Sequence, residues 1–365
     1  MHRSTVEVYE REGATYAVRR GLQRPERAEA FAAALPPGGL RLDLGSGPGH
    51  YLSLLGRPAL AADAAGAMLE AARLAAPDVP AVQVDLADLP FAPAAFAGVW
   101  ASKAHQHLPA TELPLALGDV HRILQVGGRL ELTMFAARSG QATFEQVSGP
   151  EDDLPGRLFT WWEPEHLQAV VTAAGFRVEA LDLMPTRDPG DHPRIELIAT
   201  AERALPDHVG AGMRLLCCGL NPSLHAADAG VGYVTGSNRF WRAMAAAGLS
   251  TSDRDPRRLL RIDHVGMTDL VKRATARADE LRAAEHREGV ERLDQLCAWL
   301  RPAAVAVVGL AGWRAAVDRR AAVGWQSRHL GGSPVYVLPS TSGLNAGTSL
   351  ADLVTHLRAA ADGPG

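Results

Sequence analysis

The chain has 365 residues, of which 47% are hydrophobic and 21% charged, a balance typical of folded globular proteins with room for two domains. No apolar run reaches transmembrane length and residues 1–20 are polar, so we expect neither a membrane anchor nor a signal peptide. Cys217, Cys218 and Cys297 lack the spacing of a zinc site or a disulfide framework. We therefore expect a cytoplasmic protein without a metal.

The net charge of −4 conceals an asymmetry between the two halves. Residues 1–213 hold 18 Lys and Arg against 27 Asp and Glu, whereas residues 214–365 hold 19 against 14. The second half is therefore the one expected to meet nucleic acid, although its small excess also fits an ordinary solvated surface. Only Lys103 and Lys272 are lysines; the arginine bias suits phosphate contacts but equally fits a GC-rich genome.

The first half alternates strand and helix signals up to about residue 203. An apolar strand at 40–44 runs into the turn Asp43-Leu-Gly-Ser-Gly-Pro-Gly49, a second strand ends at Asp63, and a third ends near Asp85. Ligands of open α/β sheets bind at the carboxyl ends of strands, where these residues fall, and a carboxylate there can hold ribose hydroxyls. The pattern predicts a nucleotide-type cofactor site.

These motifs resemble those of class I S-adenosylmethionine-dependent methyltransferases over about residues 1–203. The resemblance extends to Arg122-Ile-Leu-Gln-Val-Gly-Gly-Arg129 and to Trp162-Glu-Pro-Glu-His-Leu167 before Ala174-Gly-Phe176. It implies a Rossmann-like fold that binds S-adenosylmethionine. It implies that Gly45, Gly47 and Gly49 line the methionine part, that Asp63 holds the ribose and that Asp85 lies near the adenine, with Asp43 as a further cofactor-binding residue.

The methyl acceptor is not identified by the sequence. Where DNA amino-methyltransferases carry an Asn/Asp-Pro-Pro-aromatic motif, this chain has Ala101-Ser-Lys-Ala-His-Gln-His107, and its first half contains no cysteine nucleophile. His105 and His107 are candidates to contact an acceptor, with ordinary loop residues as the alternative. A degenerate domain is the alternative for the whole half, and the intact glycine turn argues against it.

Residues 204–213 contain one proline and two glycines without periodicity, which predicts a linker between domains at 1–203 and 214–365. The second half then begins with a strand at 213–219. A helix at 238–247 ending at Gly248, strands at 303–309 and 335–338, and a final helix from Ser349 with Asp352 as its capping partner follow. This order predicts a second α/β domain.

Excising a base from duplex DNA needs a positioned water, an aromatic surface for the flipped base and a residue that fills the hole. Asn221 follows a buried strand in Gly219-Leu-Asn-Pro-Ser223 and can hold a water, unless Asn-Pro only makes a turn. Tyr233 can stack on a base or belong to the core. The loop Pro339-Ser-Thr-Ser-Gly-Leu-Asn345 presents Leu344 for insertion. The helix start Ser237-Asn-Arg-Phe-Trp241 can face phosphate, while Phe240, Trp241 and Met244 bury the helix.

The order and spacing of these segments resemble the mismatch-specific uracil/thymine DNA glycosylases of the uracil-DNA glycosylase superfamily, over about residues 214–360. The resemblance implies that Asn221 positions the attacking water, that Tyr233 stacks on the base, and that the backbone of Leu220 and Tyr233 reads the uracil edge. It further implies a wedge of Gly343, Leu344 and Asn345, with phosphate contacts from Asn238, Arg239 and Ser342.

Three other positions refine this interpretation. Ala226 lies near the expected C5 position of the base, and its small side chain would admit thymine or a C5-modified uracil. Ser223 replaces the second glycine of the family motif, and Ser340-Thr341 stands where relatives show Asn-Pro. Both departures put local contacts in doubt.

Asp269 is a candidate for a chemical role that Asn221 cannot fill, since an amide takes up no proton. It lies in His264-Val-Gly-Met-Thr-Asp-Leu270, which resembles a segment bordering the pocket in these enzymes. A carboxylate there can activate water or stabilise the cationic sugar. The alternative is a surface aspartate paired with Arg273.

The sequence thus predicts two three-layer α/β domains, a Rossmann-like methyltransferase fold and a uracil-DNA glycosylase-like fold. The glycosylase is expected to be monofunctional, because no lysine in its motifs can form a Schiff base, and to need no cofactor or metal. We expect a monomer, nucleoid-associated in a bacterial-type cytoplasm, acting on double-stranded DNA with a mispaired or damaged base. The alternatives are a second half that only binds mispairs, and a methyltransferase of small molecules or RNA as the main function.

Overall fold

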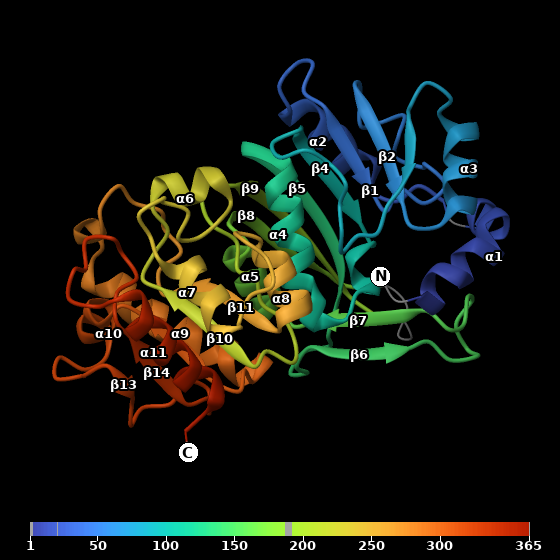
Figure 1. Cartoon of the computed structure of the whole chain (residues 1–365). Helices are drawn as coiled ribbons and strands as arrows, with labels where there is room; N and C mark the ends of the chain where they lie inside the picture. The colour runs from blue at the N-terminus through green and yellow to red at the C-terminus, as the bar shows by residue number, and fades with distance from the viewer. Residues whose placement is uncertain (1–2, 20, 187–191, 365) are drawn as a thin grey trace. The chain divides into compact units, whose positions relative to one another are not determined.

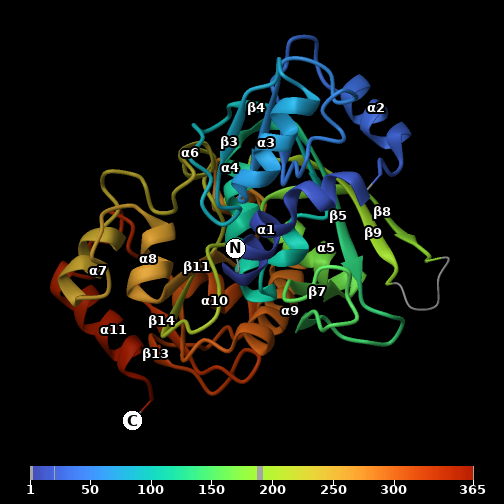
Figure 2. The same ribbon diagram turned by 90° about the vertical axis from the view of Figure 1, so that its right-hand side faces the viewer.

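The computed structural model describes residues 3–19, 21–186 and 192–364. The chain divides into two compact units, Met1–Glu202 (unit 1) and Arg203–Gly365 (unit 2). Each unit has its own β-sheet with helices packed on it (Figures 1 and 2). The prediction of two α/β domains is therefore confirmed.

Unit 1 contains one sheet in the order β3-β2-β1-β4-β5-β7-β6, with β9 paired to β5 and β8 to β9. Neighbouring strands from β3 to β7 are parallel, and β6, β8 and β9 add antiparallel pairs. The strands are β1 (Arg41–Leu44), β2 (Ala59–Asp63), β3 (Ala81–Gln83), β4 (Phe96–Ser102), β5 (Leu124–Ala136), β6 (Phe144–Val147), β7 (Leu158–Trp162), β8 (Phe176–Met184) and β9 (Arg194–Ala201).

The strand order of unit 1 reverses between β1 and β4, and the connections after these two strands diverge to leave a crevice at the carboxyl edge of the sheet. All four residues of β1 are buried, including the charged Arg41 and Asp43, because the strand lies inside a parallel sheet that is covered on both faces. The α-helices are α1 (Arg3–Arg19), which packs on α3, α2 (Pro25–Ala34), α3 (Gly66–Ala75), α4 (Leu113–Ile123) and α5 (Pro164–Ala173). Short 3-10 turns cover His105–His107 and Ala110–Glu112.

Unit 2 has a sheet in the order β11-β10-β12-β14-β13, parallel except for the β13–β14 pair. The strands are β10 (Leu215–Gly219), β11 (Val265–Asp269), β12 (Val305–Val308), β13 (Gly324–Trp325) and β14 (Val335–Leu338). The helices are α6 (Leu224–Ala229), α7 (Phe240–Ala247), α8 (Pro256–Asp263), α9 (Ala283–Leu300), α10 (Leu310–Ala316) and α11 (Leu350–Asp362), with a 3-10 turn at Ala278–Glu280.

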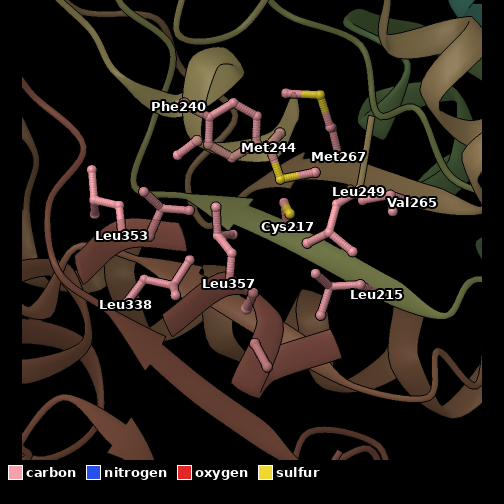
Figure 3. Packing of buried hydrophobic residues seen from close by; sticks show 14 of the residues in the cluster. Leu215, Cys217, Phe240, Met244, Leu249, Val265, Met267, Leu338, Leu353 and Leu357 are labelled. Atoms are coloured by element: carbon pink, nitrogen blue, oxygen red, sulfur yellow. The ribbon is translucent and has the colours of Figure 1, made fainter. Parts of the chain in front are cut away.

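The core of unit 2 on one face of the sheet is formed by buried side chains of β10, β11, β14, α7 and α11 (Figure 3). Cys217 and Phe240 lie at its centre, and burial of each large apolar side chain contributes about 1.5–3 kcal/mol. Cys217 and Cys218 are both buried on β10, as the sequence predicted. This packing fixes the carboxyl end of β10, from which the Asn221 loop begins.

Helix ends in unit 2 follow the predicted capping signals. Gly248 adopts the left-handed conformation after α7, and Ser349 and Asp352 form a reciprocal capping box at α11. Helix α7 begins at Phe240 rather than 238, because the Asn238 Oδ1 accepts a hydrogen bond from the Phe240 N–H at 3.0 Å and serves as a cap.

Residues 204–213, for which we predicted a linker, pack within unit 2. His208 exchanges two backbone hydrogen bonds with Met267 of β11, and Val209 and Met213 are buried. Proline and glycine correctly indicate irregular backbone here. They do not indicate a linker, because the apolar side chains of the segment are buried against parts of unit 2 that are distant in the sequence. Across the described ranges, no helix is both long and apolar enough to cross a bilayer.

Candidate functional sites

A cleft opens at the carboxyl edge of the unit 1 sheet. Its lining includes Asp43, Gly45, Gly47 and Asp63, four of the predicted cofactor residues. The Asp63 carboxylate accepts hydrogen bonds from the backbone N–H groups of Gly47 and Ala65, both at 2.9 Å. The carboxylate therefore ties the glycine turn to the end of β2.

The two cleft carboxyl groups are buried close together. Burial, followed by the charge of Asp63, raises the pKa of Asp43 to about 8, and burial also raises the pKa of Asp63. The Asp43 Oδ2 is buried without a hydrogen-bond partner. Gly47 has a left-handed φ of 53° and open space where a side chain would point, so the turn leaves room for a ligand beside these groups.

Two predicted cofactor residues lie outside the cleft lining. Gly49 faces α3 instead, where a Cβ would lie 3.0 Å from the Ala72 Cα, so its role is close packing. Asp85 is exposed, and its Oδ1 accepts a hydrogen bond from the Ala87 N–H in the turn beside Leu86, which does line the cleft.

The two histidines after β4 have different surroundings. His107 lines the cleft, with Nδ1 2.7 Å from the Leu158 carbonyl oxygen and Nε2 3.0 Å from the Tyr9 hydroxyl. Because a carbonyl only accepts, Nδ1 carries the proton and Nε2 accepts from Tyr9. His105 is fully buried and outside the cleft lining. Burial lowers the pKa of both imidazoles to about 4.

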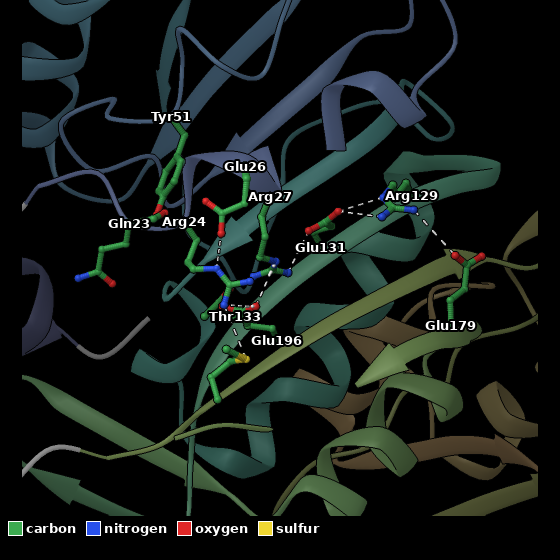
Figure 4. A network of polar contacts seen from close by, with 11 residues as sticks. Gln23, Arg24, Glu26, Arg27, Tyr51, Arg129, Glu131, Thr133, Glu179 and Glu196 are labelled. Atoms are coloured by element: carbon green, nitrogen blue, oxygen red, sulfur yellow. Dashed lines mark hydrogen bonds and ion pairs between the residues drawn. The ribbon is translucent and has the colours of Figure 1, made fainter. Parts of the chain in front are cut away.

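Beside the cleft, an ion network joins α2 to β5 and β9 (Figure 4). Arg27 pairs with Glu131 at 2.9 Å and with Glu196 at 3.4 Å, and its guanidinium lies over the ring of Trp100. No local pattern predicts this network, because the paired residues lie about a hundred or more residues apart.

In unit 2, the loop after β10 places Asn221 at the sheet edge. The Asn221 Nδ2 donates to the Thr275 Oγ1 at 2.7 Å and to the carbonyl oxygens of Pro222 and Arg273, both at 3.1 Å. A carbonyl oxygen can only accept, so these contacts fix the amide with Oδ1 as its free acceptor end. The structure thus orients Asn221 to accept a hydrogen bond from a ligand or a water.

Gly219, Asp269 and Tyr233 meet at this edge. Gly219 pairs with Asp269 in the β10–β11 register. A Cβ on Gly219 would lie 2.3 Å from the Asp269 Oδ1 and 3.0 Å from the Tyr233 hydroxyl oxygen, so only glycine fits. Asp269 is 7% exposed, and burial raises its pKa to about 6. It is not the surface partner of Arg273, which pairs with Glu285 at 2.6 Å.

The Tyr233 ring is held rigidly. It stacks on Phe240 with ring centroids 4.0 Å apart, and the Trp241 Nε1 donates to the neighbouring Gly232 carbonyl oxygen at 2.9 Å. Tyr233 itself has a left-handed φ of 57°, an uncommon conformation for an aromatic residue that clusters at functional sites. Its hydroxyl is buried without a hydrogen-bond partner.

The loop after β14 presents Leu344, whose side chain is 96% exposed. At Gly343 the loop passes so near Ser237 that a Cβ would lie 2.8 Å from the Ser237 carbonyl oxygen. The Asn345 side chain turns back into the loop, where its Nδ2 donates to the Ser340 carbonyl oxygen and the Thr348 Oγ1. Leu344 is thus the projecting residue of a tightly bonded loop.

The sequence predicts that Arg239 faces outward to phosphate. In the structure, Arg239 instead forms hydrogen bonds within this loop. Its guanidinium donates to the carbonyl oxygens of Ser342, Asn345 and Thr348. Its backbone N–H donates to the Thr341 carbonyl oxygen. The predicted phosphate residue Asn238 is the helix cap described above. The Ser342 Oγ accepts from the Leu344 N–H at 3.3 Å.

The remaining predicted positions surround the Asn221 loop. The Leu220 side chain packs against Gly312 of α10, and its carbonyl oxygen accepts a hydrogen bond from the Val271 N–H at 2.9 Å. Ser223 caps α6 by accepting from the Ala226 N–H at 3.1 Å, so the family's missing glycine is replaced by a helix cap, and Ala226 is buried. In the part of the chain that the structure describes, no group of three or more His, Cys, Asp or Glu is arranged to hold a metal ion.

Two family models match the chain. Residues 206–360 match the model described as the uracil DNA glycosylase superfamily, and residues 42–132 match that of a methyltransferase domain. The protein joins a methyltransferase domain to a uracil-DNA glycosylase superfamily domain. The glycosylase match begins at residue 206, inside the segment predicted as a linker, in agreement with the packing of that segment on β11.

Solved structures similar to this chain include methyltransferases. A methyltransferase from Methanosarcina mazei is 16% identical, with 50% of this chain and 99% of that chain covered and a TM-score of 0.43. The 1,6-didemethyltoxoflavin-N1-methyltransferase from Burkholderia thailandensis is 18% identical, with 54% and 88% covered and a TM-score of 0.42.

Proposed function

We propose that the glycosylase domain hydrolyses the N-glycosidic bond of uracil in G·U mispairs and leaves an abasic site. The observation that carries this proposal is the anchored amide of Asn221, whose free Oδ1 lies on the same sheet edge as the buried Asp269 carboxyl group and the Tyr233 ring. A site that only bound mispairs would need the aromatic ring and the wedge, but neither the amide nor the carboxylate.

In the proposed reaction, Leu344 enters the duplex and the displaced uracil stacks on the free face of Tyr233. A water donates to the Asn221 Oδ1 and attacks C1′ of the sugar, which has oxocarbenium character. The new C1′–O bond forms as the C1′–N1 bond breaks, and the bonding electrons leave with the uracil. Asp269 takes the proton of the water and stabilises the cationic sugar.

The domain acts without a Schiff base. Lys272 is the nearest lysine in sequence to the site motifs, and its ammonium donates to Asp207 and to the Leu205 carbonyl oxygen, both at 2.6 Å. A nucleophilic amine would have to be free and deprotonated. The product is therefore an intact strand with an abasic site.

The experiment that tests this function incubates the full chain with oligonucleotides that contain one uracil, single-stranded or opposite G or A, followed by alkaline cleavage. We expect cleavage with G·U as the best substrate. A G·T duplex in the same series tests whether the small Ala226 admits a C5 methyl group. Binding to G·U without any cleavable product would instead identify a mispair-binding module.

Asn221→Ala should lower the single-turnover excision rate by about 10³-fold, because the attacking water loses its acceptor. Affinity for a G·U duplex with an uncleavable sugar should stay within about twofold, because the wedge and the aromatic ring remain. Excision that survives this substitution at the wild-type rate would rule out the mechanism.

A second candidate activity is methyl transfer in the cleft of the methyltransferase domain. The residues present fit S-adenosylmethionine: the unpartnered Asp43 Oδ2 is an acceptor for its ammonium group, Asp63 is an acceptor for ribose hydroxyls, and Gly47 leaves space between them. When bound, this cofactor supplies an electrophilic methyl group. The acceptor, a small molecule or RNA if this is the main function, would lie on the His107 side of the cleft.

Titration of S-adenosylmethionine against the full chain should show binding that Asp63→Ala weakens at least about tenfold. Absence of binding would identify a degenerate domain.

A further inference from the structure

A buried ion cluster lies behind the sheet edge that carries Asp269. Asp207 is 1% exposed, and both of its carboxylate oxygens are occupied. Its Oδ1 accepts from the Lys272 Nζ at 2.6 Å and from the Thr268 Oγ1 at 2.7 Å, and its Oδ2 accepts from the Arg292 Nη1 at 2.7 Å. Although burial alone would raise the pKa of Asp207, the charges of Arg292 and Lys272 hold it below its ordinary value. Asp207 is therefore ionised at neutral pH.

The cluster binds the Thr268 side chain and the backbone carbonyl of Asp269. Arg292 also donates to the Asp269 carbonyl oxygen and, at 3.0 Å, to the Thr268 Oγ1. Successive residues of a strand point to opposite faces, so the Thr268 side chain enters the cluster while the Asp269 side chain faces Gly219. A change at Asp207 would consequently reach the position of Asp269 through one residue of β11.

The cluster also sets the local charge that Asp269 experiences. Lys272 and Arg292 favour its carboxylate, whereas Asp207 opposes it. The other ionisable groups that interact with Asp269 are Tyr233 and Cys218, both buried and neutral. Removal of Asp207 alone would leave two cations beside Asp269, and removal of Lys272 alone would leave one cation opposed by the Asp207 carboxylate.

The residue types agree with a specific function for the cluster. Lys272 is one of only two lysines in a chain that otherwise uses arginine. A compact ammonium can reach both Asp207 and the Leu205 carbonyl oxygen, each at 2.6 Å, where a planar guanidinium would be too wide. These two acceptors belong to the segment that directly follows unit 1.

We propose that Asp207 is a positioning residue of the glycosylase site, which fixes the end of β11 and balances the charges of Lys272 and Arg292 so that Asp269 can act as the base. The segment 203–213 then contributes a positioning residue to the site of the glycosylase domain. This inference rests on the proposed function of Asp269.

The test measures single-turnover excision of uracil from a G·U duplex between about pH 4.5 and 8.5 with full-length variants. Wild type should lose activity as the pH falls through about 6, where Asp269 is protonated. Asp207→Asn should lower the plateau rate about tenfold and move this acid limb down by about half a pH unit or more, because two unopposed cations favour the carboxylate. Lys272→Gln should move the limb up. The exposed Asp228→Asn, which loses only a surface pair with Arg203, should leave rate and limb unchanged.

The proposal is supported if the acid limb moves down in Asp207→Asn and up in Lys272→Gln. A cluster with a merely structural role would lower the rates of both variants without moving their acid limbs. If Asp207→Asn fails to fold, the double variant Asp207→Asn/Lys272→Gln removes one charge of each sign, and its limb should lie closer to wild type than that of Lys272→Gln. Limbs that stay at the wild-type pH in all variants overturn the proposal. A wild-type profile without an acid limb, or full activity of Asp269→Asn, overturns the proposed function of Asp269 instead.

Discussion

In the proposed reaction, Asn221 and Asp269 divide two tasks between a neutral and an ionisable side chain. The Asn221 amide is held by three acceptors through Nδ2, so its direction does not depend on pH. Asp269 has a pKa raised by burial to about 6, close to the value that suits a general base near neutrality. In the proposed reaction the amide therefore supplies geometry, and the carboxylate supplies the pH dependence.

Asp269→Asn should lower excision by about 10²- to 10⁴-fold at pH 8, where the wild-type carboxylate is ionised, and should abolish the acid limb near pH 6. The same substitution should stabilise the fold at pH 8. A raised carboxyl pKa means that the folded state binds the proton more tightly, so wild-type stability falls as the pH rises through 6. The difference of about 2 pH units corresponds to about 3 kcal/mol.

Thermal melts of wild type and Asp269→Asn at pH 5 and pH 8 measure this effect. The gap between the two melting temperatures should widen at the higher pH. An equal gap at both values would show that the pKa of Asp269 is not raised in the folded protein, and would contradict its assignment as a base that titrates near pH 6.

At the scale of elements, Arg239 at the start of α7 is the main support of the loop after β14 that carries Leu344. It contacts three carbonyl oxygens between Ser342 and Thr348, about a hundred residues away in the chain. The fan of guanidinium N–H groups suits several acceptors at once, and a lysine ammonium cannot reach the same set. The conformation of the loop thus depends on one side chain of another element.

Arg239→Lys should lower excision from double-stranded G·U substrate about tenfold or more, while excision from single-stranded uracil DNA changes by less than about twofold, because only the duplex needs the wedge. Comparison of the two substrates in one series measures this. Arg242→Lys, on an exposed position of the same helix, is the matched control and should alter neither. Equal losses on both substrates would place Arg239 in the chemistry rather than in the wedge.

At the scale of the whole molecule, each site is assembled from residues of its own unit. The proposed cofactor cleft uses residues before Glu202, and the proposed excision site uses residues after Arg203. The two proposed activities should therefore be separable by substitution within the intact chain. Asp63→Ala should leave uracil excision within about twofold of wild type, and Asn221→Ala should leave S-adenosylmethionine affinity equally unchanged. A loss of excision in folded Asp63→Ala protein would reveal coupling between the domains.

Local signals predicted much of this arrangement. The apolar runs before Asp43 and before Gly219 indicated buried parallel strands, and parallel strands bring their carboxyl ends to one edge. The direction of Arg239 and the packing of 204–213 could not be predicted, because each depends on a partner far along the chain. No sequence pattern indicated a role for Asp207, because the proline and glycines of its segment indicated only a loop.

The hydrogen bonds that hold the Leu344 loop also determine when its conformational entropy is lost. Fixing the backbone of one residue costs about 1–2 kcal/mol, and here that cost for Ser342–Thr348 is met during folding, through Arg239 and Asn345. A disordered loop would pay it anew at every encounter with a base pair. If the proposed function holds, the protein would probe successive pairs along a duplex with a rigid tip, and the ease with which a pair opens, rather than loop ordering, would limit the rate of its search.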